Sequence, residues 1–189
     1  MRKFMLEEIK EAKENGTLVS IERDDVDENC LQAFVLDYSD ELVLLQYVYD
    51  FNLDGLMVIR MDDITDVYMG AINILQTQML KEEGLYEKVE FDIQCDLSNW
   101  RTTLSTLGQR CDYLILEDEN PQDPMFLMGK LAEVNDDYVL VNGFDGEGLW
   151  DDEATELGYD EITAMKVNNN YINFYKRYFE RHPSAVDYE

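Results

Sequence analysis

The sequence predicts an α+β protein, mainly β, in which a five-stranded module flanked by short helices occurs twice. Short apolar and β-branched runs alternate with turn residues along the chain, which is typical of strands joined by tight turns. Phrases also recur at nearly constant spacing: residues 62–65 (DDIT) match 160–163 (DEIT), and 40–44 (DELVL) match 136–140 (DDYVL). Because the offsets are 98 and 96 residues, we predict an internal duplication.

The first copy is predicted to contain a helix, five strands and a second helix. Residues 4–14 have a helical pattern that ends at Asn15-Gly16, a helix stop signal. Strands are predicted at 18–22, 31–38, 42–49, 56–61 and 64–68, with polar loops at 23–29 and 50–55. Ile72, Leu75, Met79 and Leu80 recur at helical spacing, so a helix is expected over 71–83, with Gly84 as its cap.

The second copy follows a connector. Val89, Phe91 and Ile93 alternate within residues 85–96, which leaves a strand and an extended linker both open. Ser98 or Asn99 can cap a helix that runs to about Gly108. Strands are then predicted at 113–117, 126–134, 138–143, 148–157 and 162–167, and a final helix over 171–179 directs Ile172, Tyr175 and Phe179 toward the core.

These elements predict four parts of the chain. The first helix-plus-β repeat covers 1–84, the connector 85–97, the second repeat 98–182, and a frayed tail 183–189. Five strands with tight turns close most economically as a small barrel, because closure removes exposed sheet edges. Each repeat is therefore expected to be a five-stranded barrel.

The element order, a helix followed by five bent strands, resembles the Sm-like branch of the small SH3-like barrels over roughly 12–70 and 99–167. Residues 126–140 (FLMGKLAEVNDDYVL) are similar to the first Sm motif, with Gly129 where the second strand bends and Asp136 after the hairpin turn. The Arg-Gly of the second Sm motif is replaced by Met61-Asp62 and Gly158-Tyr159. The resemblance implies a nucleic-acid-associated protein, since members often form rings that bind uridine-rich RNA. The sequence also resembles bacterial proteins without a known activity.

The amino-acid composition limits the classes of function that fit this chain. The chain has 189 residues, of which 46% are hydrophobic, which is enough for a core. Its 42 acidic and 15 basic residues give a net charge of −27, and residues 112–161 hold 16 acids and one base, Lys130. Such a surface can serve solubility alone or can attract a basic partner. It argues against nucleic-acid binding, which needs clustered cations; the one basic cluster comprises Lys166, Lys176, Arg177 and Arg181.

The expected location is the cytoplasm. Cys30, Cys95 and Cys111 are odd in number and show no CxxC spacing, which suits thiols in a reducing compartment. The charged start MRKFMLEEIK lacks the apolar core of a signal peptide, and no apolar run approaches the ~20 residues that span a bilayer. We therefore expect no membrane association.

Catalytic motifs are missing from the sequence. With a single histidine, His182, both Ser-His-Asp and Cys-His arrangements and histidine-based metal sites are disfavoured. There is no P-loop and no GxGxxG. The sequence therefore predicts a non-enzymatic protein without a cofactor.

One loop offers a weak alternative metal site. Asp50, Asn52 and Asp54 precede Gly55 at the spacing of the first half of an EF-hand loop, but the closing glutamate would fall at Met61. Asp, Asn and Gly also favour tight turns because they tolerate positive φ. A strand-to-strand turn is the preferred interpretation, and weak Ca²⁺ or Mg²⁺ binding stays open.

The predicted partner surface lies in the second repeat, on Asp145, Glu147, Asp151, Asp152 and Glu153, with Trp150 as a candidate aromatic anchor. Burial of Trp150 in the core is the competing interpretation. The leading hypothesis is an acidic interaction protein for a basic protein partner, in its sharpest form an inhibitor or immunity-type protein. The alternative is an Sm-like nucleic-acid-associated protein, and a homo-oligomer stays open.

Overall fold

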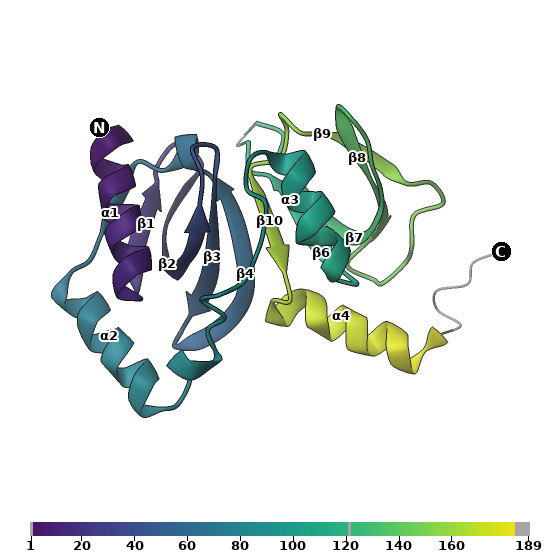
Figure 1. Ribbon diagram of the computed structural model, residues 1–189. Helices are drawn as coiled ribbons and strands as arrows, with labels where there is room; N and C mark the ends of the chain where they lie inside the picture. The colour runs from purple at the N-terminus through teal and green to yellow at the C-terminus, as the bar shows by residue number, and fades with distance from the viewer. Residues whose placement is uncertain (1, 121, 184–189) are drawn as a thin grey trace. The chain divides into compact units, whose positions relative to one another are not determined.

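The computed structural model describes residues 2–120 and 122–183, and it confirms an α+β fold that is mainly β (Figure 1). The chain divides into two compact units, residues 1–98 and 99–189. Apart from Pro183, the predicted tail lies outside the described residues. Among the helices that the structure describes, none is both long enough and apolar enough to cross a membrane.

The first unit combines an antiparallel sheet with two α-helices. Its elements are α1 (Arg2–Asn15), β1 (Val19–Arg23), β2 (Asp27–Tyr38), β3 (Leu42–Tyr49), β4 (Asn52–Arg60), the 3-10 helix η1 (Met61–Asp63), β5 (Asp66–Tyr68), α2 (Ala71–Glu82) and the 3-10 helix η2 (Tyr86–Lys88). The strand order is β5-β1-β2-β3-β4. Helix α1 packs on β2 and β5, and Lys13 donates a 2.6 Å hydrogen bond to Asp37 of β2.

The second unit repeats this order. Its elements are α3 (Trp100–Thr106), the 3-10 helix η3 (Gly108–Arg110), β6 (Leu114–Asp118), β7 (Met125–Val134), β8 (Tyr138–Phe144), β9 (Thr155–Gly158), β10 (Ala164–Val167) and α4 (Asn170–Arg181). The strand order β10-β6-β7-β8-β9 matches that of the first unit strand for strand. Asn99, one of the two expected caps, caps α3 by accepting a 3.0 Å hydrogen bond from the Thr102 N–H.

The predicted closed barrels are wrong. In the described part of each unit, no ladder joins the end strands, β4 to β5 or β9 to β10, so the antiparallel sheet stays open. The resemblance to Sm-like and SH3-like barrels is thereby overturned. Strand β5 has three residues and β9 has four, which leaves few backbone groups for closing a barrel. Short end strands that carry Asp66 and Glu156 protect the edges by length and charge instead of closure.

Several strand boundaries also differ from the predictions. Residues 27–29 belong to β2, and β4 begins at Asn52, because the polar stretches are shorter turns than expected. Of the strand predicted at 148–157, only 155–157 lies in β9. The connector contains no strand among its described residues. It packs on the first unit instead, where Tyr86 and Phe91 make edge contacts with the Phe34 ring at centroid distances of 5.5 and 5.9 Å.

Matched hydrogen bonds explain the recurring phrases. Thr65 N–H donates to the Glu22 carbonyl at 2.8 Å, and Thr163 N–H donates to the Glu117 carbonyl at the same distance. Each threonine hydroxyl also accepts a bond from a backbone N–H, that of Asp24 in the first unit and Glu119 in the second. The β2–β3 ladder shifts register between Val35 and Asp37, and the β7–β8 ladder shifts between Leu131 and Glu133, 96 residues later.

Candidate functional site

An aromatic cluster holds α4 against the sheet of the second unit. Phe179 of α4 packs among Tyr113, Phe144 and Trp150, with ring centroids 5.0 to 6.2 Å apart. Ile172 is buried in the same cluster, as predicted for this helix. Such edge and tilted contacts add to the free energy gained from burying the rings. The cluster therefore fixes where α4 and the acidic loop after β8 lie.

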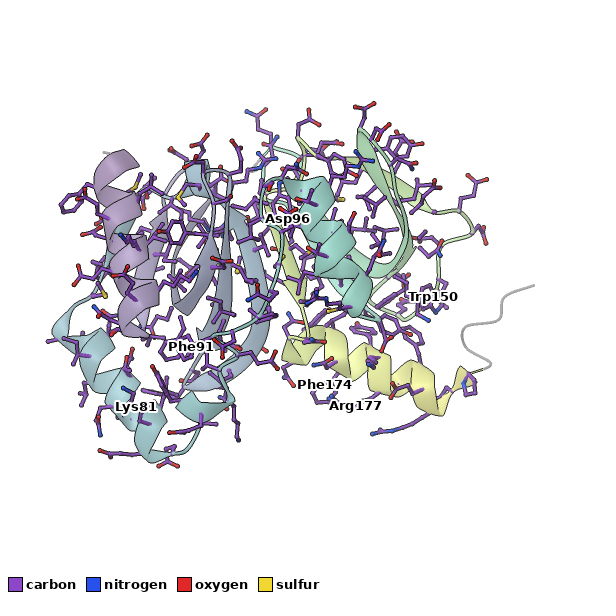
Figure 2. All side chains as sticks on the ribbon, viewed as in Figure 1. Lys81, Phe91, Asp96, Trp150, Phe174 and Arg177 are labelled. Atoms are coloured by element: carbon purple, nitrogen blue, oxygen red, sulfur yellow. The ribbon has the colours of Figure 1, made fainter. Side chains whose placement is uncertain are left out.

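Trp150 is part of this cluster. It is partly buried, it forms an isolated bridge with Phe144, and its ring packs 5.2 Å from that of Phe179. The burial interpretation of Trp150 is thus closer to the structure than the exposed anchor (Figure 2). A side chain that is already packed against three rings contributes to the fold, and it offers a partner less area than a fully exposed ring would.

The loop after β8 is ordered by Asp145. Its carboxylate accepts hydrogen bonds from the N–H groups of Glu147 and Leu149 at 2.9 and 3.0 Å. Tyr175 of α4 donates its hydroxyl to the Gly146 carbonyl at 2.9 Å. A hydrogen bond with Tyr171, and then burial, raise the pKa of Tyr175 above its ordinary value. A phenol is already protonated at neutral pH, so the hydroxyl can donate there. The loop is therefore attached to the helix at a defined place.

This attachment creates an aromatic groove, which we define by its lining residues Glu147, Gly148, Phe174, Tyr175 and Tyr178. Its volume is about 270 Å³, and its lining is mainly apolar. Phe174 is 61% exposed and Tyr178 is 47% exposed, although both are large rings. Glu147 is the one acidic residue of this lining. An apolar groove with one acidic group suits the aliphatic stem and charged head of lysine or arginine.

The acidic residues predicted as a partner surface are brought together only in part. Asp145, Glu147, Asp151, Asp152 and Glu153 are all exposed and belong to one loop between β8 and β9. Asp145 directs its carboxylate into the loop, whereas Glu147 lines the aromatic groove. In the stretch 145–153 there are five acids and no base, so the loop is a local concentration of negative charge.

The basic residues near the C-terminus are largely engaged within the second unit. Lys166 of β10 binds Glu117 at 2.8 Å, and Lys176 pairs with Asp112. The guanidinium of Arg177 lies 4.4 Å from the ring centre of Phe174 (Figure 2). Lys130, the one base of 112–161, lies 4.9 Å from the ring of Tyr113 and 5.4 Å from that of Trp150. Tyr113, Trp150 and Phe174 thus each have a cation of their own chain over the ring.

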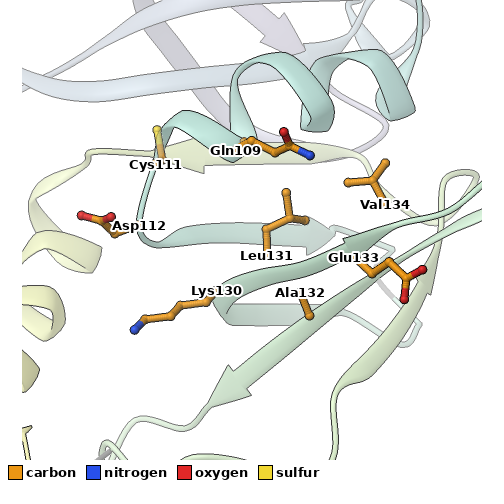
Figure 3. Close-up of a pocket in the computed structure, with 9 residues that line it drawn as sticks. Gln109, Cys111, Asp112, Lys130, Leu131, Ala132, Glu133 and Val134 are labelled. Carbon is orange, nitrogen blue, oxygen red and sulfur yellow. The ribbon is translucent and has the colours of Figure 1, made fainter.

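A second hollow, of about 430 Å³, lies between η3 and β7 and includes Cys111, Asp112, Lys130 and Glu133 (Figure 3). These residue types could support a nucleophilic thiol. Burial, however, raises the pKa of Cys111, and the charge of Asp112 raises it further. A raised pKa keeps the thiol protonated and lowers its nucleophilicity at neutral pH. This hollow therefore gives no support to cysteine chemistry.

The alternative metal loop forms a two-residue turn between β3 and β4. Asp50 and Phe51 have φ values of 47° and 63°, and Asn52 donates its side-chain amide to the Asp50 carbonyl at 3.0 Å. Asp54 lies within β4. The turn interpretation is confirmed. Over residues 2–120 and 122–183, no group of three or more His, Cys, Asp or Glu side chains is arranged to hold a metal ion.

Sequence reasoning missed Phe174 and Tyr178 as candidate site residues. The signal was available: they are four residues apart, on the side of the helix opposite to Ile172 and Phe179. A helix that is aromatic on both faces buries one face and exposes the other.

Comparison with known proteins finds no family model, no curated protein and no solved structure that matches this chain.

Proposed function

We propose that this chain is a non-enzymatic binding protein whose second unit docks a basic protein partner. The aromatic groove beside the loop 145–153 is the observation that carries the proposal. Negative charge speeds the encounter with a cationic surface, and rings that are desolvated on binding prolong the complex. An inhibitor or immunity-type protein, which shields a basic toxin or nuclease, is the most specific form of this proposal.

The acidic loop and the aromatic groove have different roles in the proposed binding. Asp151, Asp152 and Glu153 are exposed, so their field reaches a partner before contact. Phe174 and Tyr178 offer exposed apolar area next to Glu147. These two rings take the anchoring role that was predicted for Trp150, because Trp150 is partly buried against the aromatic cluster. A lysine or arginine that enters the groove would place its alkyl stem on the rings and its charge near Glu147.

The test is an NMR titration of the full chain with a lysine-rich peptide, at low salt. Shifts are expected in residues 145–153 and in α4. The double variant Asp151→Asn with Asp152→Asn should weaken binding more than Glu7→Gln with Glu11→Gln, a control that removes the same charge from exposed positions of α1. Equal weakening by both pairs would show that net charge alone attracts the peptide, and would reject the site.

The variant Phe174→Ala distinguishes the contribution of the aromatic groove to binding from that of the acidic charges. Because it leaves all charges in place, we expect a faster dissociation rate with a nearly unchanged association rate. An unchanged dissociation rate would show that the groove does not hold the partner, and would overturn the proposal.

The nucleic-acid alternative gains no support from the site. Lys166, Lys176 and Arg177, three of the four residues of the basic cluster, already have partners within the second unit. A gel shift with a uridine-rich strand at about 150 mM salt, where screening acts beyond ~8 Å, tests this alternative directly.

We also propose that the two units descend from one duplicated module. The support is the shared strand order, the matched threonine hydrogen bonds and the bulges 96 residues apart. In an experimental structure, residues 12–70 should superpose on 99–167 with all five strands in register. A register shift in two or more strands would contradict the duplication.

A further inference from the structure

Helix α2 is oriented with its polar side inward. Its buried residues include Asn73 and Thr77, whereas Ile72, Leu75 and Met79 are 67%, 60% and 42% exposed. A surface helix normally directs its apolar stripe to the core. We call the stripe formed by Ile72, Leu75 and Met79 the α2 face. The α2 face is exposed to solvent. Lys81 lies in the last turn of this helix (Figure 2).

Hydrogen bonds hold α2 in this orientation. Asn73 donates its side-chain amide to the Ser20 hydroxyl of β1 at 2.9 Å. The Thr77 hydroxyl accepts a 3.0 Å bond from the Leu18 N–H. Rotating the helix to bury its apolar stripe would break both bonds and leave buried polar groups without partners, which costs free energy. The exposed apolar stripe is therefore the consequence of specific contacts in the fold.

Charge indicates what covers the α2 face. Residues 67–80 contain no charged side chain, and this is the longest uncharged run in a chain of net charge −27. A basic partner would gain nothing electrostatic here, unlike at the loop 145–153. A second copy of the chain, in contrast, is repelled by nearly every other surface. It meets the least repulsion where both copies are uncharged.

We propose that the α2 face is a self-association surface, through which two copies of this chain pair about a two-fold axis. A two-fold interface presents the same patch on both sides, so it must be self-complementary. Residues 72, 75 and 79 are spaced three and four apart, which is the seam of paired helices, and all three are aliphatic or thioether side chains. Two such stripes can pack against each other without burying a charged side chain that would need an opposite charge.

This dimer has a distinctive salt dependence. Each copy carries −27, so long-range repulsion opposes association and salt relieves it. Dimerisation should therefore strengthen as salt increases, whereas docking of a basic partner on the second unit should weaken. The two proposals can fail independently, because they lie on different units and respond to salt in opposite directions.

The experiment is sedimentation velocity of the full chain at about 50 mM and about 500 mM NaCl, where the Debye length falls from roughly 14 to 4 Å. Wild type is expected to dimerise at high salt with a Kd at least tenfold tighter than at low salt. Leu75→Gln should raise the Kd at least tenfold, because it removes the centre of the stripe without adding charge. The control is Phe4→Gln on α1, an exposed apolar residue that lies outside both the α2 face and the aromatic groove, and it should dimerise as wild type does.

Circular dichroism and urea unfolding check that both variants fold, as expected for side chains about 60% exposed. A wild type that stays monomeric at high salt up to about 100 µM, which detects any Kd tighter than that, overturns the proposal. So does a Leu75→Gln variant that dimerises like wild type. A dimer that Phe4→Gln abolishes instead would place the interface on α1, and would equally reject the α2 face.

Discussion

At the scale of the residue, Gly148 supports the aromatic groove through its backbone. Its φ is +79°, and a Cβ there would meet only the Phe179 ring at 3.8 Å, an ordinary contact. We predict that Gly148→Ala lowers the free energy of unfolding by about 1–2 kcal/mol, because L side chains disfavour this conformation. Gly146→Ala is the control, since open space surrounds its Cβ position. Urea unfolding at neutral pH measures both; equal effects would contradict the argument.

A second residue-scale prediction concerns the pair of Lys176 and Asp112. The hydrogen bond from Lys176 and its charge hold the pKa of Asp112 below its usual value, and the same bond raises the pKa of Lys176. A lowered carboxyl pKa stabilises the fold above the unfolded pKa, and this contribution disappears as pH falls through the folded pKa. The raised lysine pKa stabilises below the unfolded lysine pKa, and this contribution is lost as pH rises through the folded one.

The variant Lys176→Gln should therefore destabilise the protein between roughly pH 4 and pH 10, and should not do so in stronger acid. The loss should be at most about 1 kcal/mol, because the Asp112 side chain is 66% exposed and water screens the pair. Carbon-13 titration of the Asp112 carboxyl should show its midpoint moving up in the variant. An unmoved midpoint would mean that the pair does not persist in solution.

At the scale of the element, α2 depends on its inward polar groups. Thr77→Val keeps the shape of the side chain but leaves the Leu18 N–H without its acceptor in a buried place. We expect a loss of about 1–3 kcal/mol in the free energy of unfolding. Thr77→Ser keeps the hydroxyl and should cost less than Thr77→Val. Hydrogen exchange at the Leu18 amide should accelerate in the valine variant alone; equal protection in both variants would argue against this bond.

The same element shows how a helix can be predicted while its orientation is not. Ile72, Leu75, Met79 and Leu80 gave the helical period, and Gly84, with φ at +67°, ends the helix as expected. Of these four apolar residues only Leu80 is buried. The helical period of the apolar residues shows that they share one face of the helix. It does not show whether that face meets the sheet, because the polar residues on the other face can also find buried partners.

At the scale of the whole molecule, net charge should govern stability. With 42 acidic and 15 basic residues, the compact state brings like charges together, and salt screens them. We predict that NaCl raises the free energy of unfolding by roughly 1–2 kcal/mol, with most of the gain below about 0.2 M, where screening changes fastest. The Leu75→Gln variant should be used, so that dimerisation does not contribute. A gain that continues linearly to high salt would indicate a general salt effect instead.

The sequence by itself determined the β-rich character, the five-strand count in each half, the presence of a turn between β3 and β4, and the positions of most strands. These features follow from local preferences, such as alternation and tolerance of positive φ, which neighbouring residues decide. The recurring phrases at 62–65 and 160–163 correspond to matched hydrogen bonds, because the threonine of each phrase binds the same place in its unit. The five acids of the predicted partner surface lie in the loop between β8 and β9, whereas the strand predicted at 148–157 is confirmed only over 155–157.

Only the tertiary structure decided where Trp150 packs, that the sheet stays open, and which face of α2 is exposed. Each depends on groups far apart in sequence. Asn73 meets Ser20 across 53 residues, and Trp150 meets Tyr113 and Phe179 from separate elements. Local sequence patterns cannot predict such distant partners. A buried hydrogen bond or ring contact stabilises the fold only when the folded chain brings both groups together.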